Sequence, residues 1–249
     1  MAAETGGDLI INHDYGAALT QYTALQETSG NTYTALTAAL HKGTHGARMT
    51  FAGSSAICDG YYVFSPTLNL RYARAYIRFP SGSYPHVAQA AYETLAFGPT
   101  FLQPSAAIIC LPMFVARSTA PTIVFLGVYH SSSIYQAGSP QPTLAVDTWH
   151  RVEIYWAKGA SANGILSLWI NGVQCINLTT ITYNYDITYV MLGSGATVDA
   201  TLPAAGQYMD QDSLKVATTP IRAYPNPLMQ GRLVTPVRGV VQLTAAGGR

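Results

Sequence analysis

Charged residues are scarce in this sequence. Lysine and arginine together number 13, aspartate and glutamate number 12, and the formal net charge of the 249 residues is +1. Charged residues make up only 10% of the chain, against roughly 25% in an average soluble domain. A chain so close to neutral lacks the strong overall field that draws proteins to nucleic acids or anionic membranes. We therefore expect neither as a partner.

Long apolar runs are also missing. The chain has no run of 18 apolar residues, so we expect nothing in it to span a bilayer. The first eight residues, Met1 to Asp8, lack a basic segment followed by an apolar stretch. That combination is the mark of a secretory signal peptide, and none is expected here.

Cysteine is rare and irregularly placed. Cys58, Cys110 and Cys175 are far apart, and no CxxC or histidine-rich spacing accompanies them. A thiol behaves as a small hydrophobe, so three buried free thiols are expected in preference to a disulfide or a metal site. Free thiols are typical of a chain kept in a reducing cytosol. The sequence predicts no metal and no cofactor.

What the sequence has in quantity is material for β-strands. Hydrophobic residues make up 49% of the chain, and 17 tyrosines are present. Short runs rich in β-branched and aromatic residues recur between clusters of glycine, proline, asparagine and serine. The clearest runs are residues 57–64, 70–79, 107–115, 122–130 and 187–192.

Helices are expected to be few and short. Residues 32–40 and 88–97 could be helical by propensity, but the first stretch begins with poor helix formers and the second ends at a Gly-Pro pair. The spacing contains no alternation of strands with helices, which excludes a doubly wound fold. We therefore predict an all-β protein.

The strongest local pattern lies between residues 147 and 180. Asn171-Gly172 separates two alternating runs, and such a pair is the strongest short-range signal for a hairpin because both residues tolerate positive φ. Three antiparallel strands are therefore expected in sequence. The predicted parts are a half-buried strand with Val152, Ile154 and Trp156, a polar loop at 158–164, and strands at 165–170 and 173–178.

This region resembles the concanavalin A-like and laminin G-like superfamily. In that pattern an aspartate, one further residue and a tryptophan begin a strand, and a Leu-Trp-Asn-Gly motif closes the next hairpin. Residues 147–156 and 164–173 are similar to these two parts. Residues 44–49 resemble an early strand of the superfamily, and residues 208–220 its final strand.

The resemblance implies a two-sheet antiparallel jelly-roll sandwich over residues 8–219. It leaves residues 1–7 as an N-terminal arm and residues 220–249 as a C-terminal arm. The fold says almost nothing about function, because lectins, glycosidases, lyases and adhesion modules share it.

Three tryptophans, Trp149, Trp156 and Trp169, lie in the matching segments. Each carries a large apolar area, and aliphatic residues flank it at alternating positions. We expect all three rings to fill the core, with stacking on a sugar as the alternative.

Acidic residues do not form a glycosidase signature. Such enzymes need two carboxylates facing each other across the scissile bond, and Asp210 with Asp212 is the sole close pair, since Glu153 has no acid within five residues. The pair also matches a structural position in the superfamily's last strand. We expect a structural or calcium-assisting role for it, although two acids alone cannot establish a calcium site.

No other catalytic constellation can be assigned. Polysaccharide lyases of this fold use a basic residue with tyrosine or histidine, but both are so plentiful here that no spacing stands out. Gly53-Ser54-Ser55 does not form a nucleophile elbow. The histidines available are His13, His41, His45, His86, His130 and His150. The sequence therefore predicts no catalytic, cofactor-binding or metal-binding residue.

The C-terminal segment differs in character from the rest of the chain. From Ser213 onward it has five basic residues and no acid, and prolines interrupt residues 220–236. A solvated tail, or an arm that folds back on its own domain, is possible. Its spaced apolar residues suit docking as a strand on another sheet, so we expect an arm that clasps a neighbouring subunit.

Together these features favour a non-catalytic interaction protein. We expect a virion subunit, a bacteriophage capsid-decoration or tail-associated protein, that forms a homo-oligomer and contacts other virion proteins. Its expected location is the virion, after assembly in the host cytoplasm. A glycan-binding, lectin-like module is the alternative, and a glycosidase or polysaccharide lyase ranks last.

Overall fold

The computed structural model describes most of the chain. The described residues are 9–12, 16, 18–53, 58–82, 92–103, 108–117, 122–130, 133–136, 141–194, 205–219 and 221. They lie in a unit that runs from Gly6 to Ile221. The predicted arms, residues 1–7 and 220–249, fall outside the described residues apart from Ile221, and the predicted domain boundaries stay a prediction.

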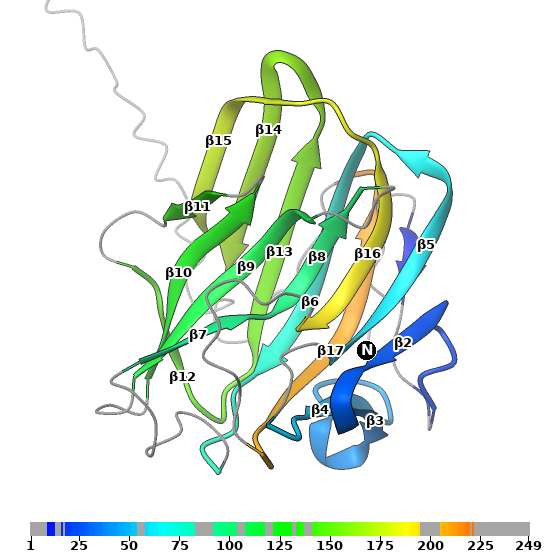
Figure 1. The fold of residues 1–249 in the computed structure, drawn as a ribbon, viewed down its shortest axis with the longest axis vertical. Helices are drawn as coiled ribbons and strands as arrows, with labels where there is room; N and C mark the ends of the chain where they lie inside the picture. Colours follow the sequence, from blue (N-terminus) through cyan, green and yellow to red (C-terminus); the bar gives the residue numbers. More distant parts are fainter. Residues whose placement is uncertain are drawn as a thin grey trace, which may run out of the picture. The chain divides into compact units, whose positions relative to one another are not determined.

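Two antiparallel sheets make up the described part of the chain (Figure 1). Sheet 1 contains, in spatial order, β15 (Val173–Tyr183), β14 (Gly159–Ile170), β13 (His150–Ala157), β6 (Leu70–Arg78), β17 (Tyr208–Ala217), β4 (Gly46–Thr50) and β3 (Thr32–Leu36), and β1 (Leu9–Asn12) pairs with β17. Sheet 2 contains β11 (Ser133–Gln136), β10 (Thr122–His130), β9 (Ile108–Arg117), β8 (Gly98–Leu102), β16 (Ile187–Ser194), β5 (Cys58–Leu68) and β2 (Ala24–Glu27); β12 (Thr143–Ala145) pairs with β10, and β7 (Tyr92–Ala96) with β9.

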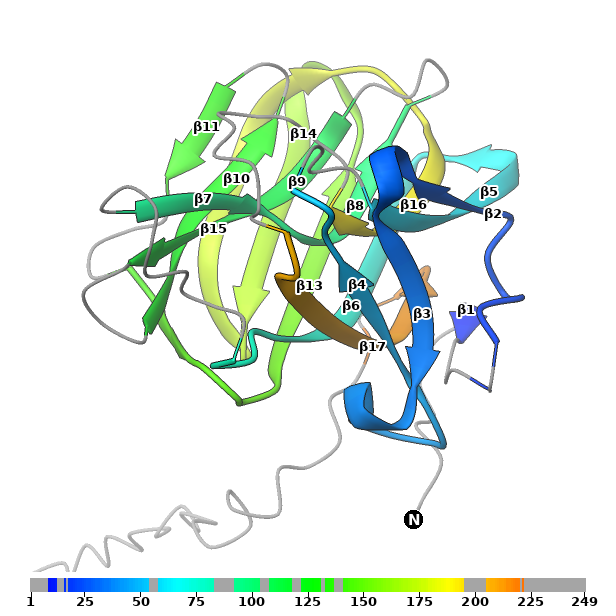
Figure 2. The same ribbon diagram turned by 60° about the horizontal axis from the view of Figure 1, so that its bottom comes forward.

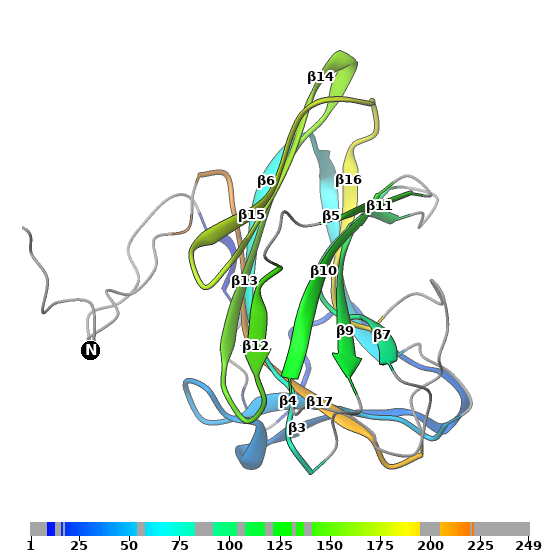
Figure 3. The same ribbon diagram turned by 90° about the vertical axis from the view of Figure 1, so that its left-hand side faces the viewer.

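The two sheets form the layers of a sandwich, which Figure 3 shows edge-on. This arrangement confirms the predicted all-β jelly-roll class. Strand β13 shows why the sequence folds this way: its residues alternate strictly between buried and partly exposed. One side of the strand therefore packs on the other sheet and one side faces outward.

Aromatic rings fill the space between the layers. Phe79 lies 5.7 Å from Phe97 and 5.4 Å from Phe114, measured between ring centroids, and the rings meet edge to face. This is the geometry that aromatic quadrupoles favour. The largest fully buried apolar side chains are Trp156, Phe51, Phe79, Phe97, Phe101, Phe114, Phe125, Met49 and Ile77.

The predicted hairpin is confirmed. Asn171 and Gly172 connect β14 to β15 with φ values of 53° and 85°, as a type I′ turn requires. The expected polar loop at 158–164 is wrong, because β14 already begins at Gly159. Gly159 pairs with Tyr183 and Gly164 with Ile181. Residues 160–163 therefore face a single residue of β15 and make this part of the strand irregular.

Helical structure is as sparse as expected within the described residues. It is limited to two single 3₁₀ turns, η1 (Thr28–Gly30) and η2 (Thr37–Ala39). None of the helices among the described residues is long and apolar enough to cross a membrane. Figure 2 shows β3 and β4 beside β17, with η2 at the end of β3.

All three cysteines are free thiols. Cys58 and Cys110 are buried, as predicted, whereas Cys175 is only partly buried. Burial raises the pKa of both buried thiols to about 12. They are therefore protonated packing groups rather than reactive thiolates.

Candidate functional site

A pair of tyrosines lies on the outer face of sheet 2. Tyr61 on β5 and Tyr189 on β16 meet edge to face, with ring centroids 5.9 Å apart. Cys58 and Phe64 of β5 belong to the core, so by alternation Tyr61 points away from it. Both tyrosines are partly exposed. Two rings presented side by side on a sheet can stack on planar or ring-shaped ligands.

Buried residues surround this pair on the same face. Met191 of β16 lies opposite Tyr61 in register, and Thr100 of β8 lies opposite Met191. Both are at most 4% exposed. We call the group Asp59, Tyr61, Thr100, Tyr189 and Met191 the tyrosine face.

Asp59 is the unusual member of the tyrosine face. It precedes Tyr61 by two residues on β5, and its relative exposure is 0%. Neither of its carboxylate oxygens has a hydrogen-bond partner in the described part of the chain. Desolvation of the charged form raises the pKa of this carboxyl group to about 7.

A glycine makes the environment of Asp59 possible. Gly193 of β16 pairs with Asp59 and has φ of +144°. A Cβ atom at this position would lie 2.6 Å from both Cα and Cβ of Asp59. The backbone of β16 can therefore lie directly against Asp59 only because residue 193 has no side chain.

A carboxyl group with these properties is suited to proton transfer. At neutral pH both its protonated and its ionised form are populated, so it can give or take a proton with little driving force. A pKa shifted strongly by burial is also a general indicator of a functional site. The tyrosine face thus combines a buried carboxyl group whose pKa lies near neutral pH with partly exposed aromatic rings.

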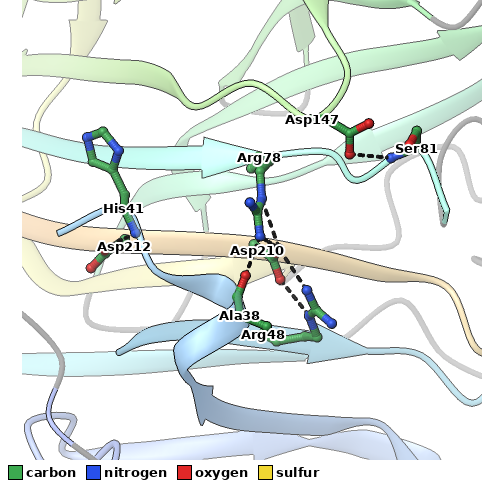
Figure 4. Close-up of polar contacts among 8 residues, drawn as sticks. All are labelled: Ala38, His41, Arg48, Arg78, Ser81, Asp147, Asp210 and Asp212. Carbon is green, nitrogen blue, oxygen red and sulfur yellow. Dashed lines mark hydrogen bonds and ion pairs between the residues drawn. The ribbon is translucent and has the colours of Figure 1, made fainter. Parts of the chain in front are cut away.

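The sole acid pair found in the sequence, Asp210 and Asp212, lies on β17 of sheet 1, and Figure 4 shows both side chains. They point away from the core, because Met209 between β4 and β6 belongs to it. Asp210 of β17 is fully buried between two arginines. Its Oδ1 lies 2.7 Å from Arg48 Nε, and its Oδ2 lies 2.6 Å from a terminal guanidinium nitrogen of Arg78. Asp210 therefore ties β17 to β4 and β6.

Asp212, the next residue of β17 that points away from the core, also holds another segment of the chain in place. Its Oδ2 accepts hydrogen bonds from the backbone N–H groups of His41 (2.8 Å) and Lys42 (2.7 Å). Arg78 donates to the carbonyl oxygen of Ala38 at 2.5 Å, so the segment after β3 is held on β17 and β6 (Figure 4). Within the described residues, no group of three or more His, Cys, Asp or Glu side chains could hold a metal ion. The predicted calcium-assisting role has no such cluster to build on there.

Asp147, which begins the predicted strand motif, fixes a neighbouring turn. Its Oδ1 accepts a hydrogen bond from the backbone N–H of Ser81 at 2.9 Å (Figure 4). Hydrogen bonds from Ser81 lower the pKa of this carboxyl group. The aspartate of the motif thus positions the chain rather than a ligand.

The tryptophan prediction is right for one ring and wrong for two. Trp156 is fully buried in the core. Trp169 is only partly buried and lies opposite Glu153 in register, on the outward side of sheet 1. Trp149 is also partly buried and lies 5.3 Å from the ring of His41, with the guanidinium of Arg78 4.9 Å away. Alternation places Trp169 outward because Leu168 and Ile170 point inward.

The four histidines of the described residues have separate surroundings. A ring nitrogen of His130 donates to the carbonyl oxygen of Ile109, and a ring nitrogen of His150 donates to that of Ala145. Burial lowers the pKa of both imidazoles, so they are neutral structural groups at pH 7. His41 and His45 are partly exposed. His13, His86 and the Ser54-Ser55 pair lie outside the described residues.

The described chain can now be compared with known proteins. No family model matches it, and no curated protein matches its sequence. Solved structures do match. The cellulose-induced protein Cip1 has a TM-score of 0.59 and 15% identity, over 86% of this chain and 100% of that one.

Two lyases give similar matches. The endo-β-1,4-glucuronan lyase from the fungus Trichoderma reesei has a TM-score of 0.55 and 13% identity, over 85% of this chain and 96% of that one. The alginate lyase vAL-1 from Chlorella virus has a TM-score of 0.56 and 13% identity, over 85% and 100%. The chain shares its jelly-roll fold with polysaccharide lyases.

These matches contradict the predicted function. A non-catalytic capsid-decoration or tail subunit was expected, and the matched structures are instead those of polysaccharide-cleaving enzymes and Cip1. The prediction that the protein is not an enzyme is wrong on the same evidence. The prediction was wrong because low charge and free thiols indicate the environment in which a protein is found. They do not indicate whether it catalyses a reaction. The predicted virion location, partner subunits and homo-oligomer are tested by no observation and stay predictions.

Proposed function

We propose that this protein is a polysaccharide lyase that binds a uronate-containing chain on the tyrosine face and cleaves it by β-elimination. The observation that carries the proposal is Asp59, a buried carboxyl group with a pKa of about 7 and no hydrogen-bond partner among the described residues, on the same face as two partly exposed tyrosines. Support comes from the fold, which is similar to that of the glucuronan and alginate lyases.

The chemistry requires two proton transfers. A base removes the proton on the carbon beside the uronate carboxyl group, and an acid protonates the glycosidic oxygen as the C–O bond breaks. The products are a reducing end and an unsaturated uronate, with no net gain of water. Proton transfer by a positioned side chain contributes roughly 10²–10⁴-fold to such a rate.

The tyrosine face supplies groups for this reaction. Tyr61 and Tyr189 are the partly exposed side chains, so they are the groups that contact the sugar and pass protons to or from it. Asp59 has no side-chain exposure and acts as a positioning residue behind them. In its neutral form it avoids repelling the substrate carboxylate, as a carboxylic acid kept protonated by burial can do.

The experiment is an assay for the unsaturated product by ultraviolet absorbance. Purified protein is incubated with glucuronan, alginate and a neutral xylan, and the variants Y61F, Y189F and D59N are compared. We expect product from a uronate polymer and none from xylan, with the rate lowered by roughly 10²-fold or more in Y61F or Y189F. For D59N we expect the pH–rate profile to lose its inflection near pH 7.

Tyr185→Phe is the matched control, because Tyr185 is 52% exposed and lies between β15 and β16, outside the tyrosine face. Its activity should equal that of the parent protein. Failure to release product from any uronate polymer would overturn cleavage. Full activity in Y61F and Y189F would overturn the location of the site.

A further inference from the structure

The outer face of sheet 1 carries a group of aromatic residues in addition to the ion pairs of Asp210 with Arg48 and Arg78. Tyr72 of β6 and Tyr155 of β13 lie opposite each other in register. Their rings stack with centroids 4.4 Å apart and an interplanar angle of 20°. Both are partly exposed, and burial raises the pKa of each phenol, so both are neutral at pH 7.

Two residues further along these strands, three side chains lie opposite one another on the same face. Arg74, Glu153 and Trp169 occupy register positions across β6, β13 and β14. Arg151 Nε lies 3.0 Å from Glu153 Oε2, and these two side chains are 18% and 19% exposed. We call Tyr72, Arg151, Glu153, Tyr155 and Trp169 the outer patch.

Positive charge exceeds negative charge around the outer patch. Arg74, Arg151 and Lys215 contribute three positive charges, and Glu153 and Asp212 contribute two negative charges, which leaves +1. Arg74 and Lys215 are at most 4% exposed, so their field reaches the surface through protein rather than water, where screening is weak. The tyrosine face, by contrast, has one carboxyl group, that of Asp59, and no lysine or arginine among the five residues that define it.

We propose that the outer patch is a second, non-cleaving attachment site for a polysaccharide that carries carboxylate groups. Trp169 and the stacked tyrosines provide surfaces for sugar rings. Arg151, whose Nε lies beside Glu153, has two terminal nitrogens that can donate to a ligand carboxylate. Adjacent strands are about 4.8 Å apart, so side chains from β6, β13 and β14 can meet successive parts of one extended chain.

The inference rests on the proposed function for the chemical class of the polymer. The outer patch itself is a different site from the tyrosine face. The outer patch belongs to sheet 1, and the tyrosine face belongs to sheet 2 on the other side of the core. One polymer can therefore be held at the outer patch while cleavage takes place elsewhere. Retention and cleavage are expected to be separable properties.

The test is affinity electrophoresis of the full chain through gels that contain alginate or glucuronan, with a neutral xylan gel for comparison. The double variant R151Q/W169A should bind the acidic polymers roughly tenfold more weakly than the parent. Added salt should weaken the binding of the parent, because part of it is electrostatic. Cleavage of short uronate oligosaccharides, which cannot reach both faces, should be unchanged.

Gln174→Ala is the matched control. Gln174 lies opposite Trp169 on β15 and is exposed, so its loss tests whether any change on this part of the sheet weakens binding. Parent-like retention of Q174A is expected. Stronger retention in xylan than in the acidic gels would overturn the charge argument.

The two proposals fail in different ways. Retention that depends on Arg151 and Trp169 without any cleavage would sustain the outer patch and overturn the lyase. Cleavage with unchanged retention in R151Q/W169A would do the reverse. A concentration-dependent dimer in sedimentation that R151Q/W169A abolishes, with polymer retention intact, would show that a second copy of the chain occupies the patch and would overturn the attachment site.

Discussion

Asp59 and Gly193 face each other across β5 and β16 so closely that no side chain fits at position 193. The φ of +144° at Gly193 is also a conformation that L side chains rarely adopt. Position 193 therefore requires glycine for two independent reasons, the close approach of Asp59 and the positive φ.

Gly193→Ala should destabilise the fold. The new methyl group would overlap Asp59, and the backbone would also be strained, so we expect a loss of about 2–4 kcal/mol in the free energy of unfolding. Urea denaturation measures it. Gly206→Ala is the control, because Gly206 also has positive φ (+84°) but open space around its Cβ position. Equal losses in the two variants would contradict the role of close contact.

The ionisation of Asp59 should make stability depend on pH. Its pKa of about 7 in the folded protein lies above the ordinary value of 3.8, so the folded state holds this proton more tightly than the unfolded state. The contribution is therefore most favourable below about pH 4 and is lost as pH rises toward about 7. Urea denaturation across this range measures the slope.

Asp59→Asn should remove that dependence. At about pH 8 the variant should be more stable than the parent, by as much as about 4 kcal/mol from the size of the pKa shift. At about pH 4 the two should be nearly equal, because Asp59 is neutral there in both states. Parallel stability profiles for parent and variant would show that Asp59 does not titrate in this way.

Asp210→Asn should destabilise the protein markedly. The change leaves Arg48 and Arg78 facing a neutral amide, and breaking a buried ion pair from one side costs about 3–5 kcal/mol. Because the two arginines are 20% and 21% exposed, we expect the lower end of that range. Urea denaturation measures the loss.

Asp186→Asn provides the comparison for Asp210. Asp186 lies 2.7 Å from Lys158, but both side chains are about one-third exposed. Surface pairs contribute roughly 0–1 kcal/mol, so the loss should be below about 1 kcal/mol. A loss as large as that of Asp210→Asn would mean that burial does not set the strength of these pairs.

Trp156 and Trp169 should differ in how much each contributes to the free energy of unfolding. Trp156→Ala removes a fully buried ring, and such a change costs about 3–5 kcal/mol. Trp169→Ala removes a partly exposed one, so the loss should be clearly smaller. Thermal unfolding of both variants checks this, and equal losses would place Trp169 in the core after all.

Local features of the sequence predicted local structure well. The alternation of residues 150–157, the Asn171-Gly172 turn and most strands were predictable, because each depends on residues only a few positions apart. The polar stretch at 158–164 was not, because its pairing with β15 is irregular. Asp59 gave no signal at all, since a single acid beside a glycine is common in any sequence.

The sequence by itself determined that this chain is all-β, that it has ample apolar material for a core, and where its central hairpin turns. Only the tertiary structure decided which residues meet. Tyr61 reaches Tyr189, and Arg48 reaches Asp210 across 162 positions, because strand pairing in a sandwich is set by packing between distant segments. The physical reason is that alternation gives each strand two faces but does not say which partner, or which side of the sandwich, each face will meet.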